Sequence, residues 1–494
     1  MNGFNAKILR IDLTLKKITV EHPPIDFYRQ YMGGRGFIVH YLLEEIAPGV
    51  DPLGPDNKLI FALGALTGHP FIGSGRNSIG AKSPLTGGFA ESEAGGFWGA
   101  ECKKAGYDAI IVEGASEKPV YLWVHNGAVE IRDAGTLWGS DVADCRRKIE
   151  QSLGEKNVRT AIIGIAGENM VRYACVLNDV THAAGRTGMG AVMGSKKLKA
   201  IAVKGSQPPL LARREDLMNM NRRMAGNYKE LTLHWKYGTG RTMLEYGQNG
   251  NLPVRNFKGG QFPGTDKISA ITLYDRYLKK MEGCYGCPIK CKRVVELQGE
   301  MTVDPVYGGP EYETLAALGS NCDIDNLEAI MKANEYCNRY GLDTISTGAA
   351  ISFAMECYDQ GMLTMADTQG LELSMGNTAA MLTMIERIAK RKGLGDLLAE
   401  GTKRAAERLG KGSEAFAMQV KGEEIPMHEP RLKQSLGLHY SVHPAGADHC
   451  TGPHSETALD TKSAEKLCSG STLAHLANHL GLCRFVPWKM EQLS

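Results

Sequence analysis

The sequence Cys284-Tyr-Gly-Cys287-Pro-Ile-Lys-Cys291 places three cysteines within eight residues. The glycine and proline between them predict a loop in which three thiolates converge on one inorganic centre. A fourth cysteine, Cys483, lies far downstream and would complete a four-thiolate set, as iron–sulfur clusters commonly require. Structural zinc is the alternative, because three close cysteines and a distant one also satisfy a four-thiolate zinc site. The spacing favours an iron–sulfur cluster and hence a protein that transfers electrons.

The composition is that of an ordinary globular protein with several domains. The chain has 494 residues, of which 43% are hydrophobic and 23% are charged, and its formal net charge is +2. This balance gives no reason to expect binding to nucleic acid or to a membrane surface. The first ten residues lack the apolar core of a signal peptide, and no apolar run is long enough to span a bilayer. We therefore expect a cytoplasmic protein whose twelve cysteines do not form disulfides.

The pattern of hydrophobic residues divides the chain into a β-rich first part and a longer helical part. Short runs rich in β-branched residues predict strands at 7–13, 58–63, 109–113, 120–124, 160–165 and 200–203. Helical spacing predicts helices at 325–338, 377–392 and 396–409, the last of them ending at Gly410. We expect three domains: a β-rich domain over 1–208, a helical domain with the cysteine loop over 209–412, and a loop-rich part over 413–494.

Two glycine-rich segments suit the binding of phosphate groups. Residues 73–88 combine glycines with Arg76, and residues 183–201 combine them with Arg186. Close backbone N–H groups together with a fixed positive charge are what a phosphate requires. Neither segment is a P-loop, because the Gly-Lys-Ser/Thr ending is absent. Tight turns in a β-rich domain are the alternative for both segments.

Side chains that suit proton transfer gather in two regions of the helical part. Glu313 lies in the first region, and the second holds His428, His443 and the run Asp448-His449-Cys450. Histidine and glutamate are readily tuned for proton transfer near neutral pH, so these residues predict a catalytic site, with a structural role as the alternative. The residues from His443 to Cys450 can also be read as metal ligands, although their spacing matches no standard zinc signature.

A short repeat connects the middle of the chain with its end. Asn338-Arg-Tyr-Gly-Leu-Asp343 and Asn478-His-Leu-Gly-Leu-Cys483 agree at three of six positions. Matches of this length arise by chance in a chain of this size. The repeat is of interest because its second copy contains Cys483.

Taken in this order, the segments resemble the aldehyde:ferredoxin oxidoreductase family of tungsten enzymes over essentially the whole chain. The most specific strings are Lys82-Ser-Pro-Leu-Thr-Gly, Ala105-Gly-Tyr-Asp-Ala and Ala191-Val-Met-Gly-Ser-Lys-Lys-Leu-Lys-Ala-Ile. The resemblance implies an α+β fold, in which an N-terminal β-sheet domain cradles a bis-pyranopterin cofactor of tungsten or molybdenum. Two mainly helical domains would follow, the last of them incomplete, with a [4Fe–4S] cluster beside one pterin.

The resemblance also implies which residues bind and which react. The catalytic acid–base pair would be Glu313 and His449. The implied cluster ligands are Cys284, Cys287, Cys291 and Cys483. Each repeat would hold one pterin, and a Mg²⁺ ion would bridge the pterin phosphates. The implied cofactor-binding residues are Arg76, Glu93, Ala183, Arg186, Asn338, Gly341, Leu342, Asp343, Asn478, Gly481, Leu482 and Cys483.

The implied activity is oxidation of a small aldehyde to a carboxylic acid, or the reverse, with ferredoxin or a ferredoxin-like subunit as the electron partner. His449 would polarise the carbonyl oxygen, and Glu313 would take a proton from water. The alternatives are a benzoyl-CoA reductase-type catalytic subunit, and a truncated, cofactor-poor paralogue that transfers electrons or acts as a scaffold. Assembly into a homodimer or a larger complex stays open.

Three departures from the family pattern bear on these expectations. Glu93 stands where some relatives have asparagine near the magnesium ion, and His182 stands where some have arginine. Relatives continue well beyond the last cluster cysteine, whereas eleven residues follow Cys483 here. We therefore expect either a truncated third domain or a separate polypeptide that completes it.

Overall fold

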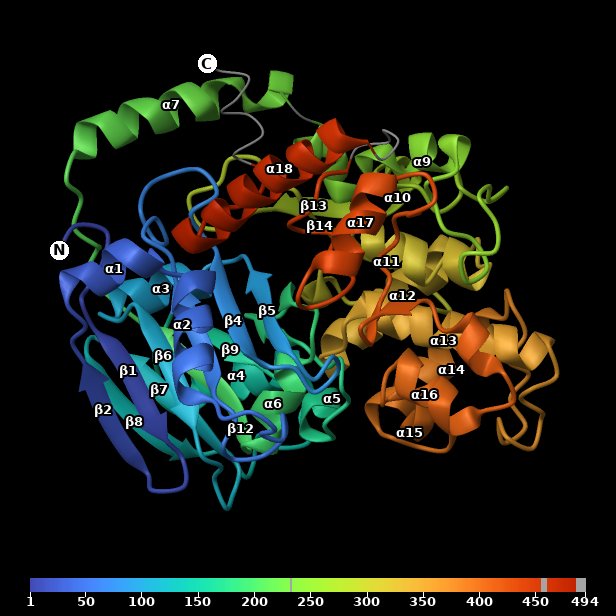
Figure 1. The fold of residues 1–494 in the computed structure, drawn as a ribbon, viewed down its shortest axis with the longest axis horizontal. Helices are drawn as coiled ribbons and strands as arrows, with labels where there is room; N and C mark the ends of the chain where they lie inside the picture. Colours follow the sequence, from blue (N-terminus) through green and yellow to red (C-terminus); the bar gives the residue numbers. More distant parts are fainter. Residues whose placement is uncertain (232, 455–459, 486–494) are drawn as a thin grey trace.

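Two six-stranded mixed sheets form the N-terminal part of the chain in a computed structural model, which describes residues 1–231, 233–454 and 460–485 (Figure 1). The first sheet has the order β2-β1-β6-β3-β4-β5, with β1 (Ile8–Asp12), β2 (Lys17–Glu21), β3 (Leu59–Leu63), β4 (Asn77–Lys82), β5 (Phe89–Ala94) and β6 (Ala109–Glu113). The second has the order β11-β10-β9-β12-β7-β8, with β7 (Val120–His125), β8 (Ala128–Asp133), β9 (Arg159–Ile162), β10 (Val176–Asn178), β11 (His182–Ala184) and β12 (Leu198–Lys204). β1 pairs with β6, and β7 with β12, in parallel. All six predicted strands are confirmed, as β1, β3, β6, β7, β9 and β12.

The two sheets share one hydrophobic core, and helices cover their outer faces. Along β3, Phe61 belongs to the shared core while its neighbour Ile60 packs beneath α1 and α2. Along β7, Leu122 likewise faces the shared core and Trp123 faces α4. Successive side chains of a strand point to opposite faces, so a strand covered on both faces is hydrophobic throughout. The helices of this part are α1 (Ile25–Tyr31), α2 (Arg35–Glu45), α3 (Trp98–Lys104), α4 (Val142–Leu153), α5 (Ile165–Glu168) and α6 (Met189–Ser195).

The rest of the chain is mainly helical, and its core surrounds α13 (Thr344–Asp359), which is buried along most of its length. Its other helices are α7 (Arg214–Leu231), α8 (His234–Tyr237), α9 (Met243–Asn249), α10 (Ala270–Tyr277), α11 (Tyr312–Ala317), α12 (Leu327–Tyr340), α14 (Thr378–Ala389), α15 (Leu394–Leu398), α16 (Thr402–Leu409), α17 (Gln434–Val442) and α18 (Thr461–Leu480). Four 3₁₀ turns cover Gly238–Thr242, Pro305–Tyr307, Ser320–Cys322 and Ser413–Phe416. Two small hairpins pair β13 (Leu278–Glu282) with β14 (Lys292–Val295), and β15 (Gln419–Val420) with β16 (Glu423–Glu424).

Two of the three predicted helices are confirmed, and the third is divided. The helices predicted at 325–338 and 377–392 are α12 and α14. The prediction of a single helix over 396–409 is wrong, because α15 ends at Leu398 and α16 begins at Thr402. Gly401 between them has φ +87, a backbone conformation that a helix does not contain. A Cβ at that position would lie 2.5 Å from Leu85 of the N-terminal part, so close approach to that part also requires glycine here.

The two copies of the short repeat occupy equivalent places in the fold. α12 and α18 each end at the residue before the repeat glycine, and Gly341 and Gly481 have φ +75 and +73, the left-handed geometry that commonly ends helices. Gly341 lies against Gly164, just beyond β9, and Gly481 lies against Gly64, just beyond β3. The two backbones touch at each junction, since a Cβ added to Gly64 or Gly164 would lie 2.1 or 2.2 Å from the backbone opposite. The weak sequence match is therefore a structural repeat.

Replacing Gly481 with alanine should destabilise the second of these junctions. A Cβ at Gly481 would lie 2.1 Å from the hydroxyl of Thr67, which accepts the N–H of Gly64 and donates to the carbonyl of Arg76. We expect a loss of about 1–3 kcal/mol in the free energy of unfolding, visible as a lower midpoint in thermal unfolding. Gly412→Ala is the matched control, because Gly412 has φ +79 with open space around it. Equal losses in both variants would mean that backbone strain alone, and not the junction, sets the effect.

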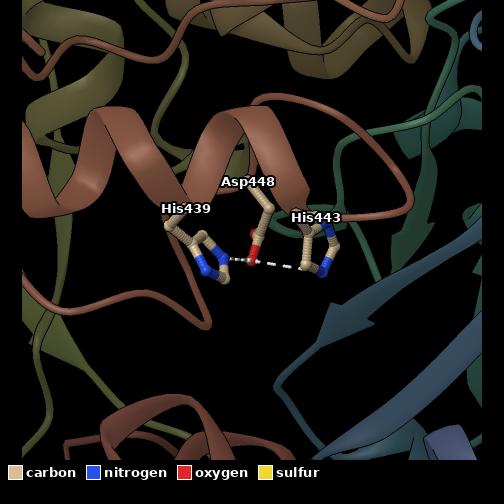
Figure 2. Close-up of side chains that lie close together, drawn as sticks. All are labelled: His439, His443 and Asp448. Atoms are coloured by element: carbon tan, nitrogen blue, oxygen red, sulfur yellow. Dashed lines mark hydrogen bonds and ion pairs between the residues drawn. The ribbon is translucent and has the colours of Figure 1, made fainter. Parts of the chain in front are cut away.

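The last described helices close over the N-terminal part. α18 lies above the two sheets in Figure 1 and contacts α2 and α17. α17 carries His439, and His443 follows at its C-terminal end; both rings face Asp448 (Figure 2). None of the described helices is both long and apolar enough to cross a bilayer.

Candidate active site

The three clustered cysteines lie in the loop between β13 and β14, and the fold brings Cys483 to them. The loop is seated on the N-terminal part through the N–H of Tyr285, which donates to the carbonyl of Gly96 at 3.0 Å. The N–H of Cys483 donates to the carbonyl of Gly73 at 2.9 Å. Cys287, Cys291 and Cys483 pack against one apolar cluster. The predicted set of four is therefore brought together, and all four thiols are free of disulfides.

The four cysteines have the environment that a metal cluster requires. Burial raises the pKa of Cys284, Cys287 and Cys291 above the usual thiol value, to about 12 for Cys287. The charge of Cys483 raises the pKa of all three further. Four crowded thiols of this kind become thiolates together only when cations compensate their charge. The residues present thus fit an iron–sulfur cluster.

Two buried arginines stand next to the last residues of the two repeats. Arg76 Nη2 lies 3.6 Å from the sulfur of Cys483. Arg186 Nε lies 3.4 Å from a carboxylate oxygen of Asp343, which also caps the N-terminus of α13. The pKa of each arginine is raised, because neighbouring negative charges outweigh the effect of burial. Each repeat therefore ends beside a fixed positive charge, in agreement with one binding site per repeat.

Arg186 also has capacity for a further ligand. Its Nη2 donates to the carbonyl of Glu424 at 2.5 Å, and its Nε lies 3.2 Å from the carboxylate of Glu423. Nε and Nη1 are buried without a hydrogen-bond partner among the described residues. Buried donors without acceptors are costly, so these groups fit an anionic or carbonyl-rich cofactor.

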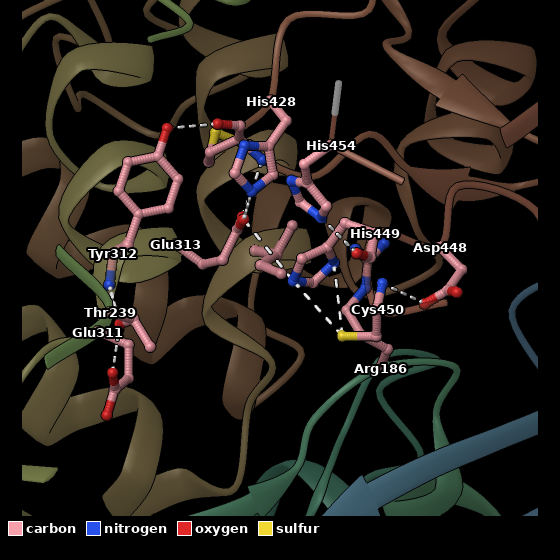
Figure 3. Close-up of polar contacts among 12 residues, drawn as sticks. Arg186, Thr239, Glu311, Tyr312, Glu313, His428, Asp448, His449, Cys450 and His454 are labelled. Carbon is pink, nitrogen blue, oxygen red and sulfur yellow. Dashed lines mark hydrogen bonds and ion pairs between the residues drawn. The ribbon is translucent and has the colours of Figure 1, made fainter. Parts of the chain in front are cut away.

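Glu313 and His449, the predicted catalytic pair, face each other across the helical part (Figure 3). Glu313 Oε1 lies 3.7 Å from His449 Nε2 and 3.1 Å from His428 Nε2. Its other oxygen accepts the backbone N–H of Met427 at 2.8 Å. α11 carries Glu313, and the loop after α17 carries His449, so residues far apart in sequence meet at one point.

The charges of this pair follow from their surroundings. Burial raises the pKa of Glu313, but His449 and the hydrogen bond from His428 outweigh it and lower that pKa to about 2. Burial lowers the pKa of His449, but Cys450 and Glu313 outweigh it and raise that pKa to about 9. Burial lowers the pKa of His428 to about 4, so His428 is a neutral ring near neutral pH, with its Nε2 3.1 Å from Glu313 Oε1. Near neutral pH the site therefore holds a carboxylate facing an imidazolium.

Two further residues of the histidine-rich region lie at this site, although the family resemblance gave neither of them a role. His428 orients Glu313, and Cys450 Sγ lies 3.6 Å from His449 Nε2. Both belong to the histidine-rich region of the sequence, but nothing in their spacing distinguishes them from the other polar residues there. Their roles depend on the approach of α11, which only the fold provides.

Cys450 should be an unusually reactive thiol. Its side chain is accessible at the surface, and the charge of His449 outweighs the desolvation of the sulfur by neighbouring atoms and lowers the pKa of Cys450 below the usual thiol value. Because thiolate is the reacting species, iodoacetamide at pH 7 should label Cys450 faster than Cys468, which is exposed on α18. Peptide mass spectrometry measures both rates, and His449→Gln should slow only the labelling of Cys450. Equal rates at the two cysteines would contradict this assignment.

The other residues predicted to bind the cofactor lie on strands of the N-terminal part and within the two repeats. Glu93 lies on β5, where Ser78 donates to it at 3.4 Å, and burial followed by repulsion from Glu91 raises its pKa to about 8. Ala183 lies on β11. The amide of Asn338 donates to the carbonyl of Tyr307 at 2.8 Å, and Asn478 is buried near the end of α18. Leu342 and Leu482 are buried beside the repeat glycines.

Four cysteines beside Arg76, with Arg186 at the other repeat, define a class of protein. This is the arrangement of redox enzymes that hold an organic metal cofactor beside an iron–sulfur cluster. Two family descriptions match the chain: "Aldehyde ferredoxin oxidoreductase, N-terminal domain" over residues 8–205, and "Aldehyde ferredoxin oxidoreductase, domains 2 & 3" over residues 216–494. The chain belongs to the aldehyde ferredoxin oxidoreductase family, as the sequence resemblance predicted.

Individual relatives agree with this membership. The tungsten-containing aldehyde ferredoxin oxidoreductase of Pyrococcus abyssi is 42% identical over 91% of this chain and 74% of its own length. The WOR-like subunit of an aliphatic sulfonate oxidoreductase of Pyrococcus furiosus is 34% identical over 98% of this chain and 80% of its own. Among solved structures, the active-site complex BamBC of benzoyl coenzyme A reductase matches with a TM-score of 0.86 at 27% identity, over 98% of this chain and 82% of that one.

Proposed function

We propose that this chain is a tungsten-dependent oxidoreductase that oxidises aldehydes to carboxylic acids, or reduces the acids, and exchanges electrons with ferredoxin through a [4Fe–4S] cluster. The observation that carries the proposal is the buried Glu313–His449 pair, in which a carboxylate and an imidazolium face each other 3.7 Å apart. Relatives at 41–42% identity are named as tungsten-containing aldehyde ferredoxin oxidoreductases, which supports tungsten over molybdenum.

The cofactors would be held by residues already described. The cysteine quartet would bind the cluster, and Arg76 and Arg186 would each bind one pterin at the end of a repeat. Glu93 and Ala183 would lie near a Mg²⁺ ion that bridges the pterin phosphates. When bound, the tungsten centre supplies the two-electron redox chemistry, and the cluster passes single electrons onward.

The protein's own groups would manage protons around the aldehyde. His449 donates a hydrogen bond to the carbonyl oxygen, which makes the carbonyl carbon more electrophilic. Glu313 accepts a proton from the water that adds to that carbon. The backbone N–H of Met427 holds one oxygen of Glu313, and the neutral ring of His428 lies beside the other, which has no hydrogen-bond partner among the described residues and can accept a proton.

The three proposed domains have the boundaries 1–208, 209–412 and 413–494. The sheet cores support the first boundary, since they draw on residues 8–203 with Tyr307 as an addition. The large helical core also takes in Leu85 and several residues within 166–191, so the two parts pack against each other there. The boundary near 412 crosses the large helical core, which reaches Met427. Limited proteolysis should therefore cut near residue 208 well before it cuts near residue 412.

A second candidate is a benzoyl-CoA reductase-type catalytic subunit, which the match to the BamBC complex favours. Purified protein tested with aldehydes and a viologen dye, and separately with benzoyl-CoA, distinguishes the two. We expect turnover of aldehydes; turnover of benzoyl-CoA alone would favour the second candidate.

Metal analysis of anaerobically purified protein tests the cofactors directly. We expect one tungsten and about four irons per chain, with the electron paramagnetic resonance signal of a reduced [4Fe–4S] cluster. Iron without tungsten or molybdenum would instead support a cofactor-poor electron-transfer or scaffold protein. Zinc in place of iron would contradict the whole assignment.

A further inference from the structure

Two histidines and an aspartate form a compact buried group next to the proposed catalytic loop. His439 lies on α17, and His443 follows at the C-terminal end of that helix, four residues later. Residues four apart on a helix lie on the same side, so both rings face the loop that returns with Asp448 (Figure 2). Both histidines are buried, and the Asp448 side chain is 17% exposed.

The distances within this group suit metal ligands better than hydrogen bonds. Asp448 Oδ2 lies 3.4 Å from His439 Nε2 and 3.8 Å from His443 Nε2, and one ligand atom from each residue falls within 4.8 Å of the others. A good N–H···O hydrogen bond spans about 2.7–3.2 Å. Two ligands at about 2.1 Å from a tetrahedral ion are separated by about 3.4 Å. A small inward movement would therefore bring all three atoms to one ion.

One nitrogen atom of this group lacks a hydrogen-bond partner among the described residues. This atom is the Nε2 of His443, which is buried, and the side chain is only 5% exposed. Leaving a buried polar atom without a partner costs about 1–3 kcal/mol. This atom lies 3.8 Å from Asp448 Oδ2, and an ion would lie between the two atoms.

The carboxylate of Asp448 is held in position by other groups. Its Oδ1 accepts the N–H of Cys450 at 2.9 Å, and its Oδ2 accepts the N–H of Thr451 at 2.8 Å as well as the Thr451 hydroxyl. Such outer contacts orient metal ligands in known sites. The guanidinium of Arg35 is engaged by the Glu91 carboxylate and lies 2.6 Å from His475 Nδ1. Among the described residues, no arginine or lysine forms an ion pair with Asp448, whose partners are His439 and His443.

We propose that His439, His443 and Asp448 bind one divalent ion of the zinc or iron(II) class, separate from the cofactors of the proposed function. Two imidazoles and one carboxylate match these metals, whereas Mg²⁺ and Ca²⁺ prefer oxygen ligands throughout. Three protein ligands leave one position for water.

Binding through Nε2 places the ring proton of His443 on Nδ1. In the structure that atom accepts the backbone N–H of Ala445 at 3.3 Å, so binding of an ion through Nε2 would break this hydrogen bond. Asp448 directly precedes His449, and the bound ion therefore anchors the loop that presents His449 to Glu313. The role of the ion is to position the loop that carries His449.

Titration of the full-length protein with Co²⁺, after dialysis against a chelator under anaerobic conditions, tests this site. Wild-type protein should bind one Co²⁺ with the visible absorption of a nitrogen- and oxygen-coordinated ion, and Zn²⁺ should displace it. His439→Ala and His443→Ala should weaken binding by more than the 10–100-fold that loss of an outer contact causes. His125→Ala, on β7 in the other part of the molecule, should bind as wild type does.

Cys450→Ser separates this site from the neighbouring combination of Asp448, His449 and Cys450, whose ligand atoms also lie within 4.8 Å of one another. Retention of Co²⁺ by Cys450→Ser supports the proposal, and its loss overturns it. If a histidine variant fails to fold, the wild-type titration decides, because wild-type protein that binds no Co²⁺ overturns the proposal. Wild-type binding in His443→Ala overturns it equally. The count of bound Co²⁺ does not depend on aldehyde turnover or tungsten content, so failure of the proposed function would leave this result unaffected.

Discussion

Glu313→Gln should lose about 10²–10⁴-fold in aldehyde turnover while keeping its tungsten and iron. Glutamine has nearly the shape of glutamate but cannot accept a proton. In this protein the carboxylate is deprotonated at neutral pH because His449 and His428 hold its pKa at about 2. The change therefore removes the proton acceptor, and the neighbouring groups remain in place. Steady-state kinetics with a viologen acceptor, together with metal analysis, measures the effect.

Glu414→Gln is the control for this variant. It makes the same chemical change at an exposed position of the helical part and should retain wild-type turnover. His428→Ala should fall between the two, because it removes the imidazole that lies 3.1 Å from Glu313 but leaves the carboxylate itself. Wild-type turnover in Glu313→Gln would remove Glu313 from the mechanism.

Cys483→Ser should lose most of its iron and all measurable electron transfer. The other three candidate ligands share one hairpin loop, whereas Cys483 reaches them from the end of α18. Loss of this ligand opens the cluster and also removes the sulfur that faces Arg76 at 3.6 Å. We expect iron to fall from about four per chain to a small fraction of that, and the signal of the reduced cluster to disappear.

Cys468→Ser is the matched control for the cluster, because Cys468 is an exposed cysteine on the same helix that leads to Cys483. It should keep the iron content and turnover of the wild type. Full iron in Cys483→Ser would show that the cluster uses another ligand or that the metal centre lies elsewhere.

Much of the cluster site could be predicted from the sequence, because its information is local. The spacing of Cys284, Cys287 and Cys291 already places three ligands on one loop. The β-rich first part was also predictable, since a strand covered on both faces is hydrophobic along its whole length, as in β3. The break before α16 was missed because the apolar spacing continues across Gly401, whose backbone conformation of φ +87 interrupts the helix.

Features of the site that depend on contacts between distant parts of the chain could not be predicted from the sequence. The repeat at Gly341 and Gly481 could not be told from chance in the sequence, yet each copy contacts the end of a strand through a glycine. The pairing of Arg186 with Asp343 joins residues from different parts of the fold. Neither pairing leaves a periodic signal along the chain, because each depends on how two surfaces meet.

The sequence by itself determined the kinds of chemistry this protein contains: a cysteine quartet, two arginine-bearing glycine loops and a histidine-rich region with Glu313 upstream. These features consist of residue types at short spacing, which a chain carries whatever its fold. The family resemblance implied that His449 meets Glu313, but only the tertiary structure placed His428 at the same carboxylate, because α11 approaches the histidine-rich region through packing of the helical core. The tertiary structure also decided the charge of each group, since a pKa depends on burial and on neighbours in space, not on neighbours in sequence.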